Sequence, residues 1–139
     1  MTAVGVGPDG GPVGVVMVCQ GQITTAHLRP YDAQDGREPF GSWQRSRPLR
    51  GYDSWPLATG DADWTVTRPM APLGETRLDF RAWSGNDWTS TSIGFSTADL
   101  AALKPGEVRY TEIDRNGREI PRTVTVEEFR AKACDTPSD

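Results

Sequence analysis

The sequence predicts a mainly β fold, in which residues 1–139 form a single antiparallel β-sandwich domain with two short helices. Apolar and polar residues alternate with a period of two along most of the chain, as in half-buried strands. Turn signals made of Gly, Pro, Asn and Asp recur about every eight to twelve residues, as they do in all-β sandwiches. The strand–helix–strand rhythm that is typical of parallel sheets is absent. The length of 139 residues suits one domain.

Short strands account for most of the chain. The alternation predicts them over residues 2–7, 12–19, 22–31, 51–57, 64–70, 75–83, 88–95, 107–113 and 118–125. Gly7-Pro8-Asp9-Gly10 has Pro where a type I turn fixes φ, so it is expected to join the first two strands as a hairpin. Gln20-Gly21 is expected to turn the chain into the third strand. Asp114-Arg115-Asn116-Gly117 joins the last two strands, with Gly117 as a bulge at positive φ.

Two short helices are predicted, one near 97–103 and one C-terminal near 126–134. Each begins with a hydroxyl residue followed three residues later by a carboxylate, which satisfies free N–H groups at a helix start: Ser96 with Asp99, and Thr125 with Glu128. The second helix places Val126, Phe129 and Ala133 along one apolar face.

Residues 32–50 interrupt the alternation and are predicted to form a long loop. The segment has no stable period and contains two Pro and two Gly. At about nineteen residues it is longer than most loops of compact domains, and loops of this kind often carry function. It also concentrates basic and aromatic residues, namely Arg37, Phe40, Trp43, Arg45, Arg47 and Arg50.

The two cysteines, Cys19 and Cys134, are predicted to form a disulfide. Cys19 ends an apolar run over 13–18, and Cys134 follows the apolar face of the C-terminal helix. A disulfide indicates an oxidising compartment, so the expected localisation is extracytoplasmic, either secreted or at the cell surface. The alternative is a pair of separate buried thiols in a cytoplasmic protein.

Charge and hydropathy exclude several kinds of partner. The net charge is −4 and the pI is near 5.0, whereas proteins that bind nucleic acids or anionic membranes favour a basic surface. No apolar stretch approaches the roughly 20 residues that a membrane-spanning helix needs. We therefore expect no nucleic-acid partner and no membrane span.

No catalytic residue, metal site or cofactor is expected. His27 is the one histidine of the sequence, and no nucleophile motif accompanies it. One His and two distant Cys do not supply the ligands of a tetrahedral zinc site. The acidic spacings Asp32-x-x-Asp35-Gly36 and Asp61-x-Asp63 do not continue into the calcium-binding pattern of an EF-hand.

Trp83 and Trp88 are expected to stack as a cross-strand pair. A four-residue turn at 84–87 would set them directly opposite each other on the face away from the core. Two interpretations stay open: the 32–50 loop covers them as a second small core, or they form an exposed aromatic patch. Together with the loop, this face supplies the predicted binding residues, which are Arg37, Phe40, Trp43, Arg45, Arg47, Arg81, Trp83 and Trp88.

The segment Leu73-Gly74-Glu75-Thr76-Arg77-Leu78-Asp79-Phe80-Arg81-Ala82-Trp83 resembles the approach to the sixth strand of fibronectin type III and immunoglobulin-like domains, which implies an immunoglobulin-like sandwich. Leu78 stands where those domains carry a corner tyrosine. The stretch over 95–106 and the terminal Glu-Glu-Phe-Arg-x-x-Ala-Cys resemble small uncharacterised β-rich proteins of high-GC Gram-positive bacteria. That resemblance implies no activity.

A non-enzymatic binding or interaction domain is the favoured function. Its partner would be a protein, and the domain would act as an inhibitor, an immunity-type protein or a subunit of a surface assembly. An Arg-lined loop favours an acidic patch on that protein partner. The first alternative is a carbohydrate-binding module that uses exposed tryptophans, and the second is a small hydrolase with an unrecognised site.

Overall fold

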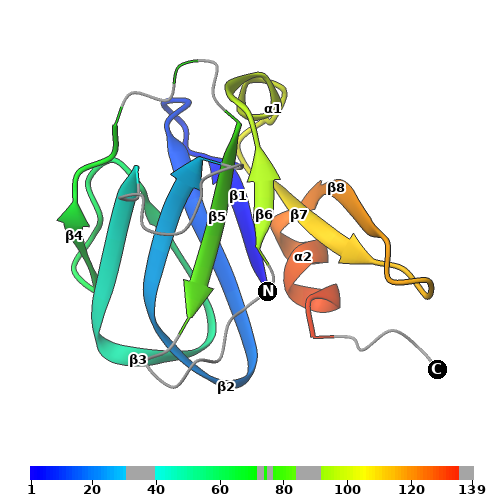
Figure 1. The fold of residues 1–139 in the computed structure, drawn as a ribbon, viewed down its shortest axis with the longest axis horizontal. Helices are drawn as coiled ribbons and strands as arrows, with labels where there is room; N and C mark the ends of the chain where they lie inside the picture. Colours follow the sequence, from blue (N-terminus) through cyan, green and yellow to red (C-terminus); the bar gives the residue numbers. More distant parts are fainter. Residues whose placement is uncertain (31–39, 72–73, 75–76, 84–91, 135–139) are drawn as a thin grey trace.

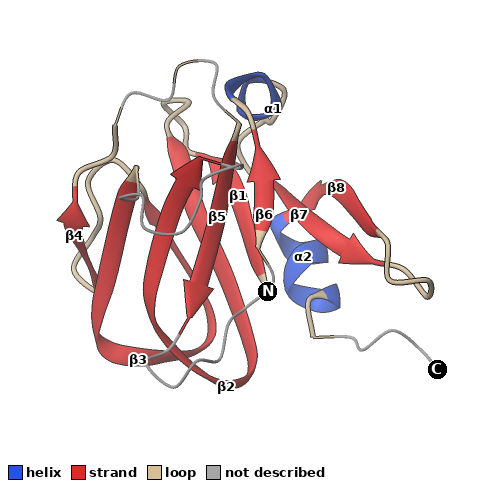
Figure 2. Cartoon of the chain, viewed as in Figure 1, coloured by secondary structure: helices blue, strands red, loops and turns tan. Residues whose placement is uncertain are grey.

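The computed structural model describes residues 1–30, 40–71, 74, 77–83 and 92–134, and it confirms the mainly β fold (Figure 1). Strands predominate in these ranges, and two short helices accompany them (Figure 2). All paired strands are antiparallel. The elements are β1 (Thr2–Val6), β2 (Pro12–Pro30), β3 (Gly41–Pro56), β4 (Trp64–Arg68), β5 (Leu78–Trp83), β6 (Ile93–Phe95), α1 (Thr97–Ala101), β7 (Glu107–Ile113), β8 (Glu119–Thr125) and α2 (Val126–Lys132).

The strands β2 and β3 form one long hairpin that bends along its length (Figure 1). The pairing runs from Val13 opposite Pro56 to Leu28 opposite Gly41. The register shifts on both sides of Ile23, so the ladder is irregular at the bend. Such bulges bend a strand and increase its twist. Each of the two strands therefore contributes to two layers of the fold.

The two halves of β2 have different second neighbours. The first half pairs with β1, and β7 and β8 extend this first layer outward. The second half pairs with β5, which pairs with β6, and β4 joins this second layer through the first half of β3. The layers are thus parts of one eight-stranded sheet, and they form a sandwich in which strands pass from one layer to the other.

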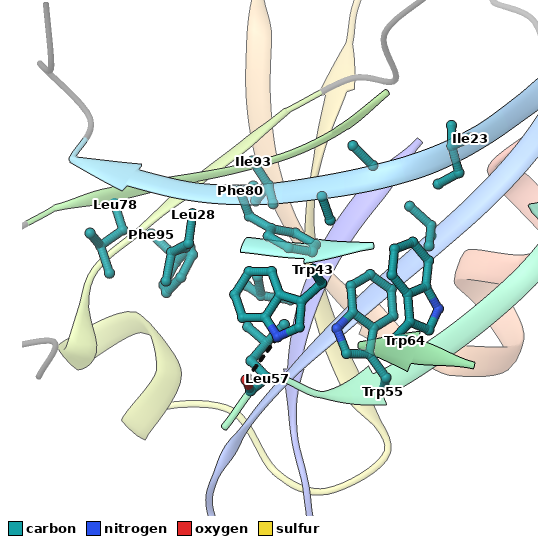
Figure 3. Close-up of a cluster of buried hydrophobic side chains, with 14 of the residues drawn as sticks. Ile23, Leu28, Trp43, Trp55, Leu57, Trp64, Leu78, Phe80, Ile93 and Phe95 are labelled. Atoms are coloured by element: carbon teal, nitrogen blue, oxygen red, sulfur yellow. Dashed lines mark hydrogen bonds between the residues drawn. The ribbon is translucent and has the colours of Figure 1, made fainter. Parts of the chain in front are cut away.

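Three tryptophans of the described chain are fully buried in the main core between the layers (Figure 3). The indole of Trp55 stacks on that of Trp64, with ring centroids 3.8 Å apart. Trp43 lies edge to face against Trp55, and its Nε1 donates a hydrogen bond of 3.0 Å to the carbonyl oxygen of Leu57. This bond satisfies the buried indole nitrogen of Trp43, whereas the buried Nε1 of Trp55 has no hydrogen-bond partner among the described residues.

Gly14 lies where the two layers approach each other. A Cβ atom at this position would lie 2.8 Å from Cδ2 of Leu57 and 2.9 Å from Cζ of Phe80. Phe80 belongs to β5 and Gly14 to the first half of β2, so the contact spans the sandwich. The absence of a side chain at Gly14 lets both neighbours pack closely.

The helix α2 covers the outer face of the first layer, where a second, smaller core forms. Its Phe129 packs edge to face against Tyr110 of β7, with ring centroids 5.5 Å apart. The Cys19–Cys134 disulfide joins β2 to the residue that follows the end of α2, so the predicted disulfide is confirmed. The buried residues of this second core are Ala3, Val15, Val108, Tyr110, Phe129 and Ala133.

Both predicted helix caps and the predicted turns at 7–10 and 114–117 are confirmed. Ser96 and Asp99 form a reciprocal capping box at the start of α1, and Thr125 accepts a hydrogen bond from the N–H of Glu128 at the start of α2. Gly117 adopts φ of 76° in the turn between β7 and β8. The hairpin of β1 and β2 also forms as expected.

Two predictions about the first half of the chain are wrong. Residues 41–50, predicted as part of the 32–50 loop, form the first part of β3. Gln20-Gly21, predicted as a turn, lies inside β2, where Gly21 adopts φ of 75° and the strand continues. The rest of the predicted loop at 32–39 and the predicted turn at 84–87 lie outside the described residues.

Candidate functional site

The outer face of β2 and β5 carries both aromatic rings and charges. The register places three residues of β2 opposite three of β5, namely Thr25 opposite Trp83, His27 opposite Arg81 and Arg29 opposite Asp79. Directly opposite residues share one face of an antiparallel pair. The residues that alternate with them, such as Ala26 and Phe80, are buried in the core. The His27–Trp83 face is defined here as His27, Arg29, Asp79, Arg81 and Trp83.

The rings of His27 and Trp83 contact each other on this face. Their centroids lie 4.2 Å apart and their planes meet at 76°, which is an edge-to-face arrangement. Nη2 of Arg29 lies 3.4 Å from Nδ1 of His27. Burial, and then the nearby charge of Arg29, lower the pKa of His27 from 6.5 to about 4. The imidazole is therefore uncharged at neutral pH, and it forms an aromatic pair with Trp83 beside a cation.

Asp79 and Arg81 form an ion pair beside the rings. Nη2 of Arg81 lies 3.6 Å from Oδ2 of Asp79, and about half of the Arg81 side chain is exposed to solvent. Burial raises the pKa of Asp79, while Arg81 and a hydrogen bond from Ser92 act in the opposite direction. Among the five residues of the face, Arg29 and Arg81 carry two positive charges against the one carboxylate of Asp79, on a protein of net charge −4. The carboxylate of Glu119 on β8 lies outside this set but near enough to raise the pKa of Asp79 further.

The structure places Arg45, a predicted binding residue, inside the fold rather than on its surface. Only 13% of its side chain is exposed, and its guanidinium lies 5.6 Å from the centroid of the Trp64 ring. Nη2 of Arg45 is 3.6 Å from Oδ2 of Asp53 and 3.8 Å from Oδ2 of Asp63. These contacts link Arg45, in the first half of β3, to Asp53 in the second half, so the role of Arg45 is structural.

The other predicted binding residues are dispersed. Trp43 is fully buried in the main core, so a partner has no access to its ring. Phe40 is partly buried against the same core. Arg47 is exposed on β3, apart from the ladder of β2 and β5. Arg37 and Trp88 lie outside the described residues, so the predicted stacking of Trp88 on Trp83 stays a prediction.

Three residues of the His27–Trp83 face were not among the predicted binding residues: His27, Arg29 and Asp79. Alternation within each strand places them on the polar face of that strand. The missing information was which strands are neighbours, because β2 and β5 are about fifty residues apart in the sequence. Two polar strand faces become one site only through this long-range pairing.

The surroundings of His27 do not favour general-base catalysis. A catalytic histidine normally has a carboxylate or carbonyl on its second nitrogen to stabilise the imidazolium. Here the polar group beside Nδ1 is the guanidinium of Arg29, which opposes protonation. Within the described ranges, no three side chains of His, Cys, Asp or Glu are grouped to hold a metal ion. In the same part of the chain, no helix is long and apolar enough to cross a membrane.

Comparisons with known proteins assign no family to this chain. No protein-family model matches the sequence. No curated protein and no solved structure is significantly similar to it.

Proposed function

We propose that this domain binds another protein through the His27–Trp83 face and acts by binding rather than by catalysis. The observation that carries the proposal is the contact of His27 with Trp83 on the outer side of the sheet, next to two arginines. Tryptophan and arginine are enriched among the residues that contribute most to protein interfaces. Both strands are integral to the sandwich, so the face is presented on a rigid support.

The charge of the face favours an acidic patch on the partner. Arg29 and Arg81 outnumber the single carboxylate of Asp79, and His27 is uncharged at neutral pH. An acidic partner would be attracted by this local charge even though the whole domain is acidic. Electrostatic attraction of this kind increases the rate of association and weakens as salt is added. The disulfide supports an extracytoplasmic setting for the interaction, secreted or at the cell surface.

A protein partner suits the face better than a sugar or a hydrolase substrate does. Sugar-binding modules present a flat, open indole, whereas Trp83 is half-buried and already contacts His27. A hydrolase would need an activated nucleophile, and the cation beside His27 reduces the basicity on which that activation depends. Carbohydrate binding therefore ranks second and hydrolysis third.

The proposal is tested by capturing partners from the extracytoplasmic proteins of the source organism on the immobilised domain. Wild type is compared with a Trp83→Ala, Arg81→Ala variant and with a matched control, Arg122→Ala. Arg122 is exposed to the same degree as Arg81 and also pairs with one carboxylate, at 2.8 Å from Glu112, but it lies on β8. Circular dichroism checks that all three proteins are folded.

We expect one set of proteins to be retained by wild type and by Arg122→Ala and lost from the double variant. Equal retention by all three would place the interface elsewhere and contradict the proposal. A parallel glycan-array experiment tests the alternative that the domain binds carbohydrate. Binding to glycans that depends on Trp83, with no protein retained, would contradict a protein partner and support a carbohydrate ligand.

A further inference from the structure

The helix α2 is held on the sheet by few buried side chains. It is seven residues long, and Phe129 is its one buried residue. Ala133, at its C-cap, is also buried, and Val126 packs partly against the second core. The other side chains of the helix face solvent. The guanidinium of Arg130 adds an exposed contact, 4.3 Å from the centroid of the Tyr52 ring.

Such a helix has little stability of its own. Isolated helices shorter than about 12–15 residues are marginal in water. Docking also restricts the backbone and side chains of every residue in the segment, and this loss of entropy opposes docking. The burial of Phe129 and Ala133 offsets only part of that loss. A covalent bond at the end of the segment therefore has a large share in keeping α2 docked.

The two ends of α2 are fixed in different ways. At its start, the N–H of Val126 donates a hydrogen bond of 2.9 Å to the carbonyl of Gly106, next to the ladder of β7 and β8. At its end, Cys134 is bonded to Cys19 of β2. Both cysteine residues are exposed, so the disulfide lies at the surface of the protein, where Sγ of Cys19 is 3.5 Å from the carbonyl oxygen of Ala133. One end is thus held by the sheet and the other by a bond that can be cleaved.

An apolar face lies under α2. It consists of residues from β1, β2 and β7, with Met17 and Tyr52 at its border. Its buried members are Ala3, Val15, Val108 and Tyr110. Loss of α2 from this position would expose these side chains, while the main core between the two layers would keep all of its contacts.

We propose that the Cys19–Cys134 disulfide is a reducible latch, and that its cleavage by a dithiol releases α2 while the β-sandwich stays folded. A thiolate of the reductant attacks one sulfur of the disulfide, which gives a mixed disulfide and one free cysteine. The second thiol of the reductant then displaces the other cysteine. The dithiol loses two electrons and two protons and becomes a disulfide. Cys19 and Cys134 gain them and become two thiols.

This latch is independent of the proposed binding function. It acts on the outer face of the first layer, whereas the His27–Trp83 face is the outer face of the second layer. Partner capture through the His27–Trp83 face is therefore expected to persist after reduction. The failure of either proposal leaves the other unaffected.

Amide hydrogen exchange of the whole chain, measured by mass spectrometry with and without dithiothreitol, tests the latch. We expect peptides that cover 126–134 to exchange at least tenfold faster after reduction, while peptides from β2 and β5 keep their protection. Unchanged protection of 126–134 would show that packing alone holds α2, and would overturn the proposal. Simultaneous loss of protection in every peptide would also overturn it, because the bond would then maintain the whole domain.

A Cys19→Ser, Cys134→Ser double variant provides the matched control. Its 126–134 peptides should exchange as fast as those of the reduced protein, and dithiothreitol should not change them further. Full protection of 126–134 in this variant would contradict the latch. An effect of dithiothreitol on the variant would equally contradict it, since the reductant would be acting at some place other than the disulfide.

Discussion

Arg45 and Asp53 belong to the same strand, yet Nη2 of Arg45 lies 3.6 Å from Oδ2 of Asp53. The two side chains meet because β3 bends together with β2, so that its halves lie in different layers. Oδ2 of Asp53 also accepts a hydrogen bond of 3.0 Å from Nε1 of Trp64. One carboxylate thus joins both halves of β3 to β4 at the side of the main core.

Replacement of Asp53 by Ala should destabilise the domain strongly. The change removes the nearer carboxylate of the largely buried Arg45 guanidinium, which keeps only the exposed Asp63 at 3.8 Å, and it removes the hydrogen-bond acceptor of the Trp64 indole N–H. Loss of one partner of a largely buried pair reduces the free energy of unfolding by about 3 kcal/mol. Urea unfolding measures the effect. The control is Asp63→Ala, whose side chain is 66% exposed, and which should cost under about 1 kcal/mol. Equal effects of the two substitutions would contradict this role of Asp53.

Gly14→Ala tests the packing of one layer on the other. The added Cβ would lie within 3 Å of Leu57 and Phe80, so either the layers must separate or these side chains must shift. We expect the free energy of unfolding to fall by about 1 to 3 kcal/mol. Gly11→Ala is the matched control, because its Cβ would meet only the side chain of Asp9 in an exposed turn. If both variants unfold at the same urea concentration as wild type, the layers do not meet at Gly14.

The lowered pKa of His27 makes stability depend on pH. Burial and Arg29 lower this pKa from 6.5 to about 4 in the folded protein. The unfolded chain therefore binds a proton that the folded protein does not bind between these values, so the free energy of unfolding falls as pH decreases from about 6.5 to about 4. Urea unfolding at both ends of this pH range measures the effect. The free energy of unfolding should decrease less for His27→Gln than for wild type.

The comparison of His27→Gln with wild type also separates the effect of His27 from the effects of other titrating groups. Asp79, whose pKa is raised by burial, changes stability in the opposite direction as pH falls, and it is present in both proteins. Its contribution therefore cancels in the difference to a first approximation. Identical pH dependence of wild type and variant would show that His27 is not desolvated as described.

Charge reversal at Arg81 should weaken partner binding. Arg81→Glu replaces the exposed cation of the His27–Trp83 face by an anion, which repels an acidic partner. We expect slower association with the captured protein, and a smaller effect of added salt than in wild type. Surface plasmon resonance at low and high ionic strength measures both quantities. Arg122→Glu is the control and should leave them unchanged. Equal association rates for wild type and Arg81→Glu would refute an acidic partner at this face.

The elements that depend on nearby residues were predictable from the sequence. The capping box of Ser96 and Asp99 and the positive φ of Gly117 each follow from interactions within a few residues. The disulfide was also predictable, because the chain has only two cysteines and both border apolar segments. These features need no knowledge of how distant strands pair.

The first half of β3 was not predictable, because its interior positions do not look apolar. Trp43 and Arg45 both point inward, so a charged residue occupies a position where alternation calls for an apolar one. Gly21 was interpreted as a turn for a similar reason, since glycine at positive φ serves both turns and bulges. The candidate site was missed in part because it forms only when β2 pairs with β5.

The most direct test of the binding proposal is a hydrogen-exchange footprint of the domain with the protein that it captures. The proposal predicts that added partner slows exchange in peptides from the second half of β2 and from β5, which carry His27 and Trp83. Peptides from β7, β8 and α2 should exchange at unchanged rates. Protection confined to those C-terminal elements, with none in β2 or β5, would contradict binding through the His27–Trp83 face.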